Sequence, residues 1–122
     1  MPRRYSRRGR NIYMHGLHPK RGPELLPNPE EVKYYIATFT SAFYPLHGGE
    51  HNLIRDMAKA RALYNVALSL HEEHRERLLN GPYRRVYVNN LAQLQRLAAR
   101  FMDDFAVAQQ KLGDLRELSL AA

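Results

Sequence analysis

The sequence predicts an all-α protein in which an extended basic amino-terminal arm leads into a short aromatic helix and a long, coiled-coil-like antiparallel helical hairpin. Three observations predict this architecture. Apolar residues recur at intervals of four and three along two long segments. A Gly81-Pro82 pair, which is typical of a helix end followed by a turn, separates these segments. The whole formal net charge of +7 lies in residues 1–23, which hold seven cations and no anion.

The amino-terminal segment, residues 1–27, is expected to form the arm, because three glycines and three prolines in residues 1–23 disfavour a long helix. Its cations favour a polyanionic partner, with nucleic acid as the first expectation, DNA before RNA, and an anionic membrane as the second. A basic tail that only keeps the chain soluble is the alternative. The residues predicted to bind nucleic acid are Arg3, Arg4, Arg7, Arg8, Arg10, Tyr13, His15, Lys20 and Arg21.

The helical domain is predicted to span residues 28–122, and its first helix about residues 29–44. Asn28 is a suitable N-cap, Pro29 suits the first helical position, and two glutamates follow where the helix dipole is positive. Aromatic side chains recur along this segment at helical spacing, which is more typical of a packing face than of a base-stacking platform. Pro45 then ends the helix.

The hairpin is predicted to consist of helices over about residues 50–80 and 85–112, with Gly113 at the end of the second of these helices. The first of these helices also has apolar residues outside its seam, so that either the aromatic helix or a neighbouring subunit must cover them. We therefore expect a homo-oligomer. The residues assigned to the hairpin or oligomer seam are Leu53, Met57, Tyr64, Leu91, Leu94, Phe101, Phe105 and Leu112.

No catalytic constellation is recognisable, and we expect the protein not to be an enzyme. The sequence has no phosphate-binding glycine loop, nucleophile elbow or acid and base pair. His71 and His74 are three residues apart, whereas the zinc-protease helix requires four, so neither a metal site nor a cofactor is predicted. The absence of cysteine, of a long apolar run and of a signal-peptide pattern favours a cytoplasmic location without membrane attachment.

The stretch Asn11-Ile12-Tyr13-Met14-His15-Gly16-Leu17 resembles an Asn-Ala-x-x-His-Gly-Leu signature that follows a basic amino terminus in phage and prophage proteins, including small terminase subunits. The similarity continues through the acidic helix start and the aromatic helix into the hairpin. Ile12 and Met14 depart from the pattern, which prefers alanine and a basic residue at these places.

The resemblance implies a non-catalytic subunit whose helical core forms a ring and whose DNA-binding part recognises viral DNA for genome packaging in the bacterial host cytoplasm. A large terminase subunit would be its protein partner. Without a recognisable helix-turn-helix, the resemblance does not extend to sequence-specific recognition, and an operator-binding regulator is disfavoured for the same reason. The alternative is a structural or adaptor subunit of a larger ribonucleoprotein or nucleoprotein complex.

Overall fold

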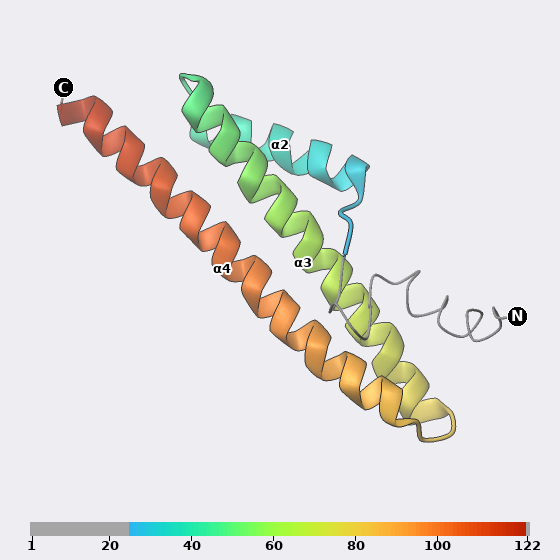
Figure 1. Cartoon of the computed structure of the whole chain (residues 1–122). Helices are drawn as coiled ribbons and strands as arrows, with labels where there is room; N and C mark the ends of the chain where they lie inside the picture. Colours follow the sequence, from blue (N-terminus) through green and yellow to red (C-terminus); the bar gives the residue numbers. More distant parts are fainter. Residues whose placement is uncertain (1–24, 122) are drawn as a thin grey trace, which may run out of the picture.

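The computed structural model describes residues 25–121, with side chains described up to residue 118. It contains α2 (Pro29–Phe43), α3 (Gly48–Asn80) and α4 (Arg85–Ala121). Helices α3 and α4 run antiparallel and side by side, and α2 folds back against the part of α3 at the open end of this hairpin (Figure 1). The predicted all-α class, with a short aromatic helix and a long helical hairpin, is confirmed.

Helix α2 begins and ends for local reasons that the sequence already indicates. The side chain of Asn28 accepts a hydrogen bond from the backbone N–H of Glu30 at 2.9 Å, and Pro29 occupies the first helical position. At the other end, Tyr44 caps the helix in the left-handed conformation with φ of 50°, and its N–H donates to the carbonyl of Thr40 at 2.9 Å. The predicted bounds therefore hold to within one residue.

Helix α3 begins two residues earlier than predicted, because His47 is its N-cap and the glycine pair Gly48-Gly49 forms part of the first turn. The helix ends at Asn80 as predicted. The N–H of Gly81 donates to the carbonyl of Arg77 at 3.1 Å, and a Cβ at this position would lie 3.0 Å from that carbonyl oxygen. Glycine is thus favoured at position 81 by the close approach of the backbone, which is extended there.

Helix α4 continues through Gly113 to Ala121, so the predicted end near Leu112 and Gly113 is wrong. The glycine faces open space, and the residues beyond it have partners. Gln110 donates to Asp114 one turn later at 3.0 Å, and Arg116 reaches a carboxylate of α3. These contacts offset the roughly 1 kcal/mol that a glycine costs inside a helix.

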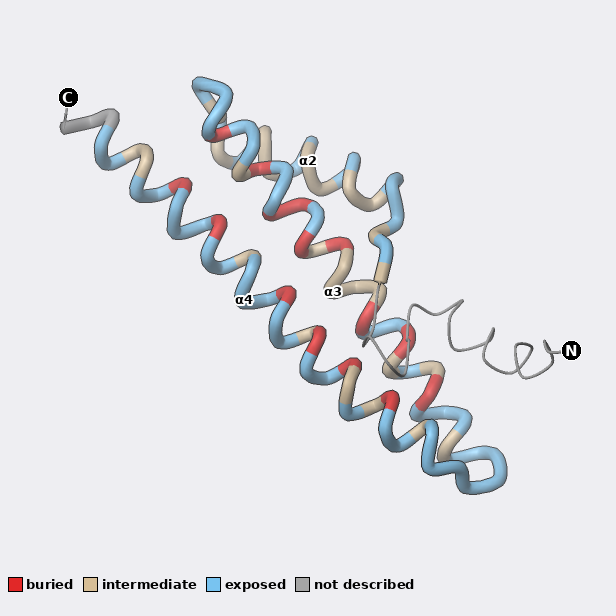
Figure 2. Tube along the Cα trace, viewed as in Figure 1, coloured by how far each residue is buried: buried red, intermediate tan, exposed pale blue. Residues whose placement is uncertain are grey.

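The hydrophobic core is a narrow seam between α3 and α4, which Figure 2 shows as buried positions on the sides where the two helices face each other. Fully buried apolar side chains each contribute about 1.5–3 kcal/mol. Of the predicted seam residues, Met57, Leu94, Phe101 and Leu112 are buried, and Leu53, Tyr64, Leu91 and Phe105 are partly buried.

Two elements cover the apolar residues of α3 that lie outside the seam. Helix α2 packs against Ile54, and its Phe39 also meets Phe105 of α4 edge to face, with ring centroids 5.6 Å apart. Leu25, just before α2, packs against the cluster that contains Leu70 and Leu94. The sequence did not decide whether α2 or a second subunit covers these residues. In the structure, α2 and Leu25 of the same chain cover much of this surface.

A second contact fixes the amino-terminal half of α2 on α3. Asn65 of α3 donates to the hydroxyl of Tyr35 at 2.8 Å and to the carboxylate of Glu31 at 3.4 Å. The guanidinium of Arg61 lies over the ring of Tyr35, 5.9 Å from its centroid, and over that of Tyr64 at 5.5 Å. Helix α2 is therefore held by polar and cation–π contacts as well as by its aromatic face.

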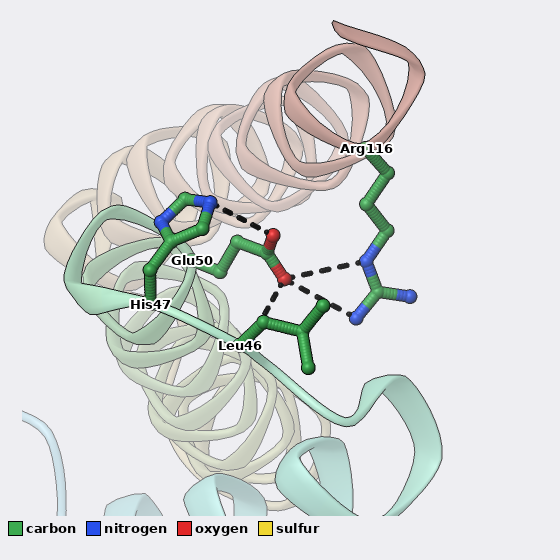
Figure 3. Close-up of polar contacts among 4 residues, drawn as sticks. All are labelled: Leu46, His47, Glu50 and Arg116. Atoms are coloured by element: carbon green, nitrogen blue, oxygen red, sulfur yellow. Dashed lines mark hydrogen bonds and ion pairs between the residues drawn. The ribbon is translucent and has the colours of Figure 1, made fainter. Parts of the chain in front are cut away.

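The open end of the hairpin is joined by a buried carboxylate (Figure 3). The side chain of Glu50 is 1% exposed, and its Oε1 accepts hydrogen bonds from the backbone N–H of Leu46 at 3.3 Å and from Arg116 Nε at 3.4 Å and Nη2 at 3.5 Å. His47 Nε2 lies 3.0 Å from Oε2, at ion-pair distance but without satisfying Oε2 as a hydrogen-bond acceptor. Arg116 also lies over the ring of Phe43, 5.9 Å from its centroid. One carboxylate thus links the α2–α3 connection, α3 and α4.

The substitution Arg116→Ala should lower the free energy of unfolding by about 1–3 kcal/mol, because it leaves the buried Glu50 without its charged hydrogen-bond donor. Urea denaturation followed by circular dichroism measures this change. Arg96→Ala is the matched control, since Arg96 is an exposed arginine of the same helix that makes no ion pair between residues 25 and 118. Equal effects of the two substitutions would contradict a role for the Glu50 contact.

The substitution Tyr44→Gly should raise the free energy of unfolding by about 0.5–1 kcal/mol, because glycine adopts the left-handed conformation without the steric cost of a Cβ. The side chain of Tyr44 is 75% exposed, so little packing is lost. Tyr34→Gly, at an exposed position inside α2, should instead destabilise the protein by about 1 kcal/mol. Thermal unfolding of the two variants should show shifts of opposite sign, and shifts of the same sign would refute the assignment of strain to Tyr44.

Candidate nucleic-acid interface

The residues predicted to bind nucleic acid lie outside the described residues, since all of them fall within residues 1–24. The structure does show where the arm joins the helical body. Leu25, the first described residue, packs against the clusters that contain Leu70, Leu94 and Ala67, in the half of the hairpin nearer its closing turn.

The same half of the hairpin contains a segment whose only charged residues are cations. Residues 77–102 hold five arginines and no acidic residue. Arg77 is neutralised by Glu73 one turn earlier on α3, at 2.7 Å. The remaining four make no ion pair with any residue between 25 and 118, and they are exposed: Arg84, Arg85, Arg96 and Arg100.

Three of these arginines form a row along α4. Arg85, Asn89, Arg96 and Arg100 follow one another at intervals of four, seven and four residues, which places them on one face of an α-helix. All four are exposed, whereas the buried positions of α4 face α3 (Figure 2). We call these four residues the arginine row. The sequence-based prediction missed it, although the acid-free run from 77 to 102 is visible in the sequence.

The end of α3 provides the contrast, because its arginines are paired with carboxylates. Arg75 Nη2 lies 3.1 Å from Glu72 Oε2. The hydrogen bond from Arg75, together with its positive charge, lowers the pKa of Glu72, and the same contact raises the pKa of Arg75. Helix α4 has no acidic residue in its first turn, where carboxylates would suit the dipole and where Arg85 lies instead.

Of the histidines of α3, His74 has structural surroundings. His74 is 2% exposed, its Nδ1 lies 3.5 Å from Nδ2 of the buried Asn90, and its ring meets that of Tyr87 edge to face at 5.9 Å. His71 is only partly buried. Among the residues that the structure describes, no three histidine or acidic side chains lie together in a way that could hold a metal ion.

A groove with a volume of about 320 Å³ lies between α3 and α4. Its apolar lining includes Leu53, Leu63 and Val107, and the last of these is 53% exposed. Its charged lining is balanced, and none of these side chains makes an ion pair with a described residue: Asp56, Lys59, Asp104 and Lys111. The groove therefore combines an apolar floor with two unpaired charges of each sign.

No protein-family model, curated protein or solved structure matches the chain. None of the helices between residues 25 and 121 is long and apolar enough to cross a membrane. The distribution of charge, the groove and the geometry of the hairpin are therefore the features that support a function.

Proposed function

We propose that this protein is a non-catalytic nucleic-acid-binding protein that acts as a homo-oligomer, in a role similar to that of small terminase subunits in viral DNA packaging. The observation that carries the proposal is the separation of charge along the chain. The cationic residues 1–23 account for the whole net charge of +7, and the remaining residues are neutral as a set. A cationic arm on a neutral body favours a polyanionic ligand held by the arm.

The mechanism rests on neutralisation of phosphates. Each arginine of the arm can make two parallel hydrogen bonds to one phosphate, and each neutralised phosphate releases a condensed counterion. Tyr13 and His15 add stacking and hydrogen bonding beside the phosphates. One arm binds weakly by itself, and several arms on one oligomer increase the affinity because they act at high effective concentration.

The groove between α3 and α4 is the surface that we propose for self-association, with a second copy of the chain as its occupant. Its rim carries Asp56 and Asp104 together with Lys59 and Lys111. Because both signs are present in equal number on one patch, two copies can pair opposite charges across a symmetric contact. The exposed Val107 adds an apolar side chain to the same lining.

Deletion of residues 1–23 should abolish detectable DNA binding at about 0.15 M salt and leave the oligomer intact. The seven cations of the arm should contribute roughly −6 per subunit to the slope of log K against log salt of the full chain, if all of them contact phosphates. Fluorescence anisotropy with a labelled DNA duplex measures both quantities. Undiminished affinity of the shortened chain would refute the proposal.

The substitution Val107→Arg should dissociate the oligomer, because it places a cation among the apolar residues that line the groove. Met102→Arg is the control, on the same helix and partly exposed but outside the groove. Light scattering should give a multiple of 14.2 kDa for the unmodified chain and the control, and a smaller mass for the variant. A monomeric unmodified chain at micromolar concentration would exclude self-association.

The same groove supports one alternative, an adaptor that docks a different protein. An apolar floor with both signs of charge at its rim suits an amphipathic helix of a partner as well as a second copy. An adaptor would be monomeric alone and would form a complex only with its partner, whereas a ring-forming subunit assembles without one. The mass measurement above therefore separates the two roles.

A further inference from the structure

We infer that the arginine row of α4 is a second phosphate-binding surface, which holds the backbone of a DNA duplex that the arm has captured. Arg85, Asn89, Arg96 and Arg100 project from one face of a rigid helix, away from α3. The charges of the three arginines of the row are not neutralised by any residue in the described part of the chain. This inference rests on the proposed function and adds the part of the helical body that would contact the ligand.

The dimensions of the row fit a duplex. Fifteen residues separate Arg85 from Arg100, which corresponds to about 22 Å along an α-helix. The same length spans about six base pairs of DNA at 3.4 Å each. Arginine and asparagine are both common donors to phosphate oxygens. The backbone of a duplex winds through more than half a turn over about six base pairs, so a straight row of this length can contact phosphates on both sides of one groove rather than follow a single strand.

The composition of the row favours phosphates over a membrane surface. All five cations between residues 77 and 102 are arginines, whose planar guanidinium matches a phosphate with two hydrogen bonds. A helix that binds a membrane must insert its apolar face into the lipid. The apolar face of α4 is occupied by α3, with Leu94 and Phe101 buried between them. The buried apolar face of α4 is therefore not available to lipid, and the apolar residues next to the row in the sequence, Val86 and Val88, are 37% and 39% exposed.

Two cations of the arm are close to Leu25 in the sequence. Leu25 packs against the cluster that contains Leu94, and Leu94 lies between Asn89 and Arg96 in the sequence of α4. Lys20 and Arg21 precede Leu25 by five and four residues, so a chain of that length keeps them within about 18 Å of it. A single duplex can therefore be reached by the arm and by the row at once.

The test is the salt dependence of duplex binding by the full chain and two variants with equal loss of charge. One variant carries Arg96→Gln and Arg100→Gln in the row. The control carries Lys33→Gln and Arg55→Gln, two exposed cations nearer the open end of the hairpin. The row variant should show a slope of log K against log salt that is shallower by about 2, whereas the control should keep the original slope. Circular dichroism and light scattering verify that both variants keep their fold and mass.

Equal slopes for the row variant and the unmodified chain would overturn the inference, and so would an equal reduction in both variants, which would reflect net charge alone. Dependence on Arg96 and Arg100 in binding to phosphatidylserine vesicles, without such dependence for DNA, would also overturn it. Absence of DNA binding by the unmodified chain would instead refute the proposed function. The two failures are therefore distinguishable, because the second is visible before any residue is changed.

Discussion

The packing of α4 along α3 is the interaction on which the rest of the structure depends. Each helix is longer than a small domain is wide, so neither can be enclosed by a compact core. Helix α4 buries mainly the face that meets α3, and α3 also buries residues under α2. Everything else follows from this two-helix geometry. Outer faces remain free for charge, a groove remains on one side of the seam, and α2 can add cover to only part of the hairpin.

The contacts of Glu50 complement the apolar packing between α3 and α4. Hydrogen bonds to a carboxylate depend on direction, whereas apolar packing does not. Antiparallel helices with a regular repeat can slide by a turn and still bury apolar side chains. The buried Oε1 of Glu50 accepts hydrogen bonds from Arg116 of α4 and from the N–H of Leu46 in the connection to α2, and an alignment shifted by one turn would lose the contact with Arg116. The cost of desolvating Glu50 thus helps to fix the register of the hairpin and the return of α2.

The sequence predicted the helix ends correctly where the local start and stop residues agree with the packing of the helices. Asn28 and Pro29 mark the start of α2, and the glycine and proline after Asn80 mark the closing turn. The predicted end of the second long helix at Gly113 was wrong. The contact that favours a longer helix joins Arg116 to Glu50, 66 positions away in the sequence, and a local pattern does not reveal it. The arginine row could have been predicted from the sequence, because its residues share one helix at helical spacing. The groove could not, because it depends on how two helices face each other.

The closing turn at Gly81 gives the hairpin a built-in order of assembly. Facing residues near the turn, such as His74 and Asn90, are 16 positions apart, whereas Glu50 and Arg116 are 66 apart at the open end. Once the contacts near the turn have formed, each further contact between the helices closes only a short additional loop. The two helices can therefore come together from the turn outwards. In this order of assembly the contacts of Glu50 and of α2 at the open end would form last, and local opening of the native state would be expected first at the same end.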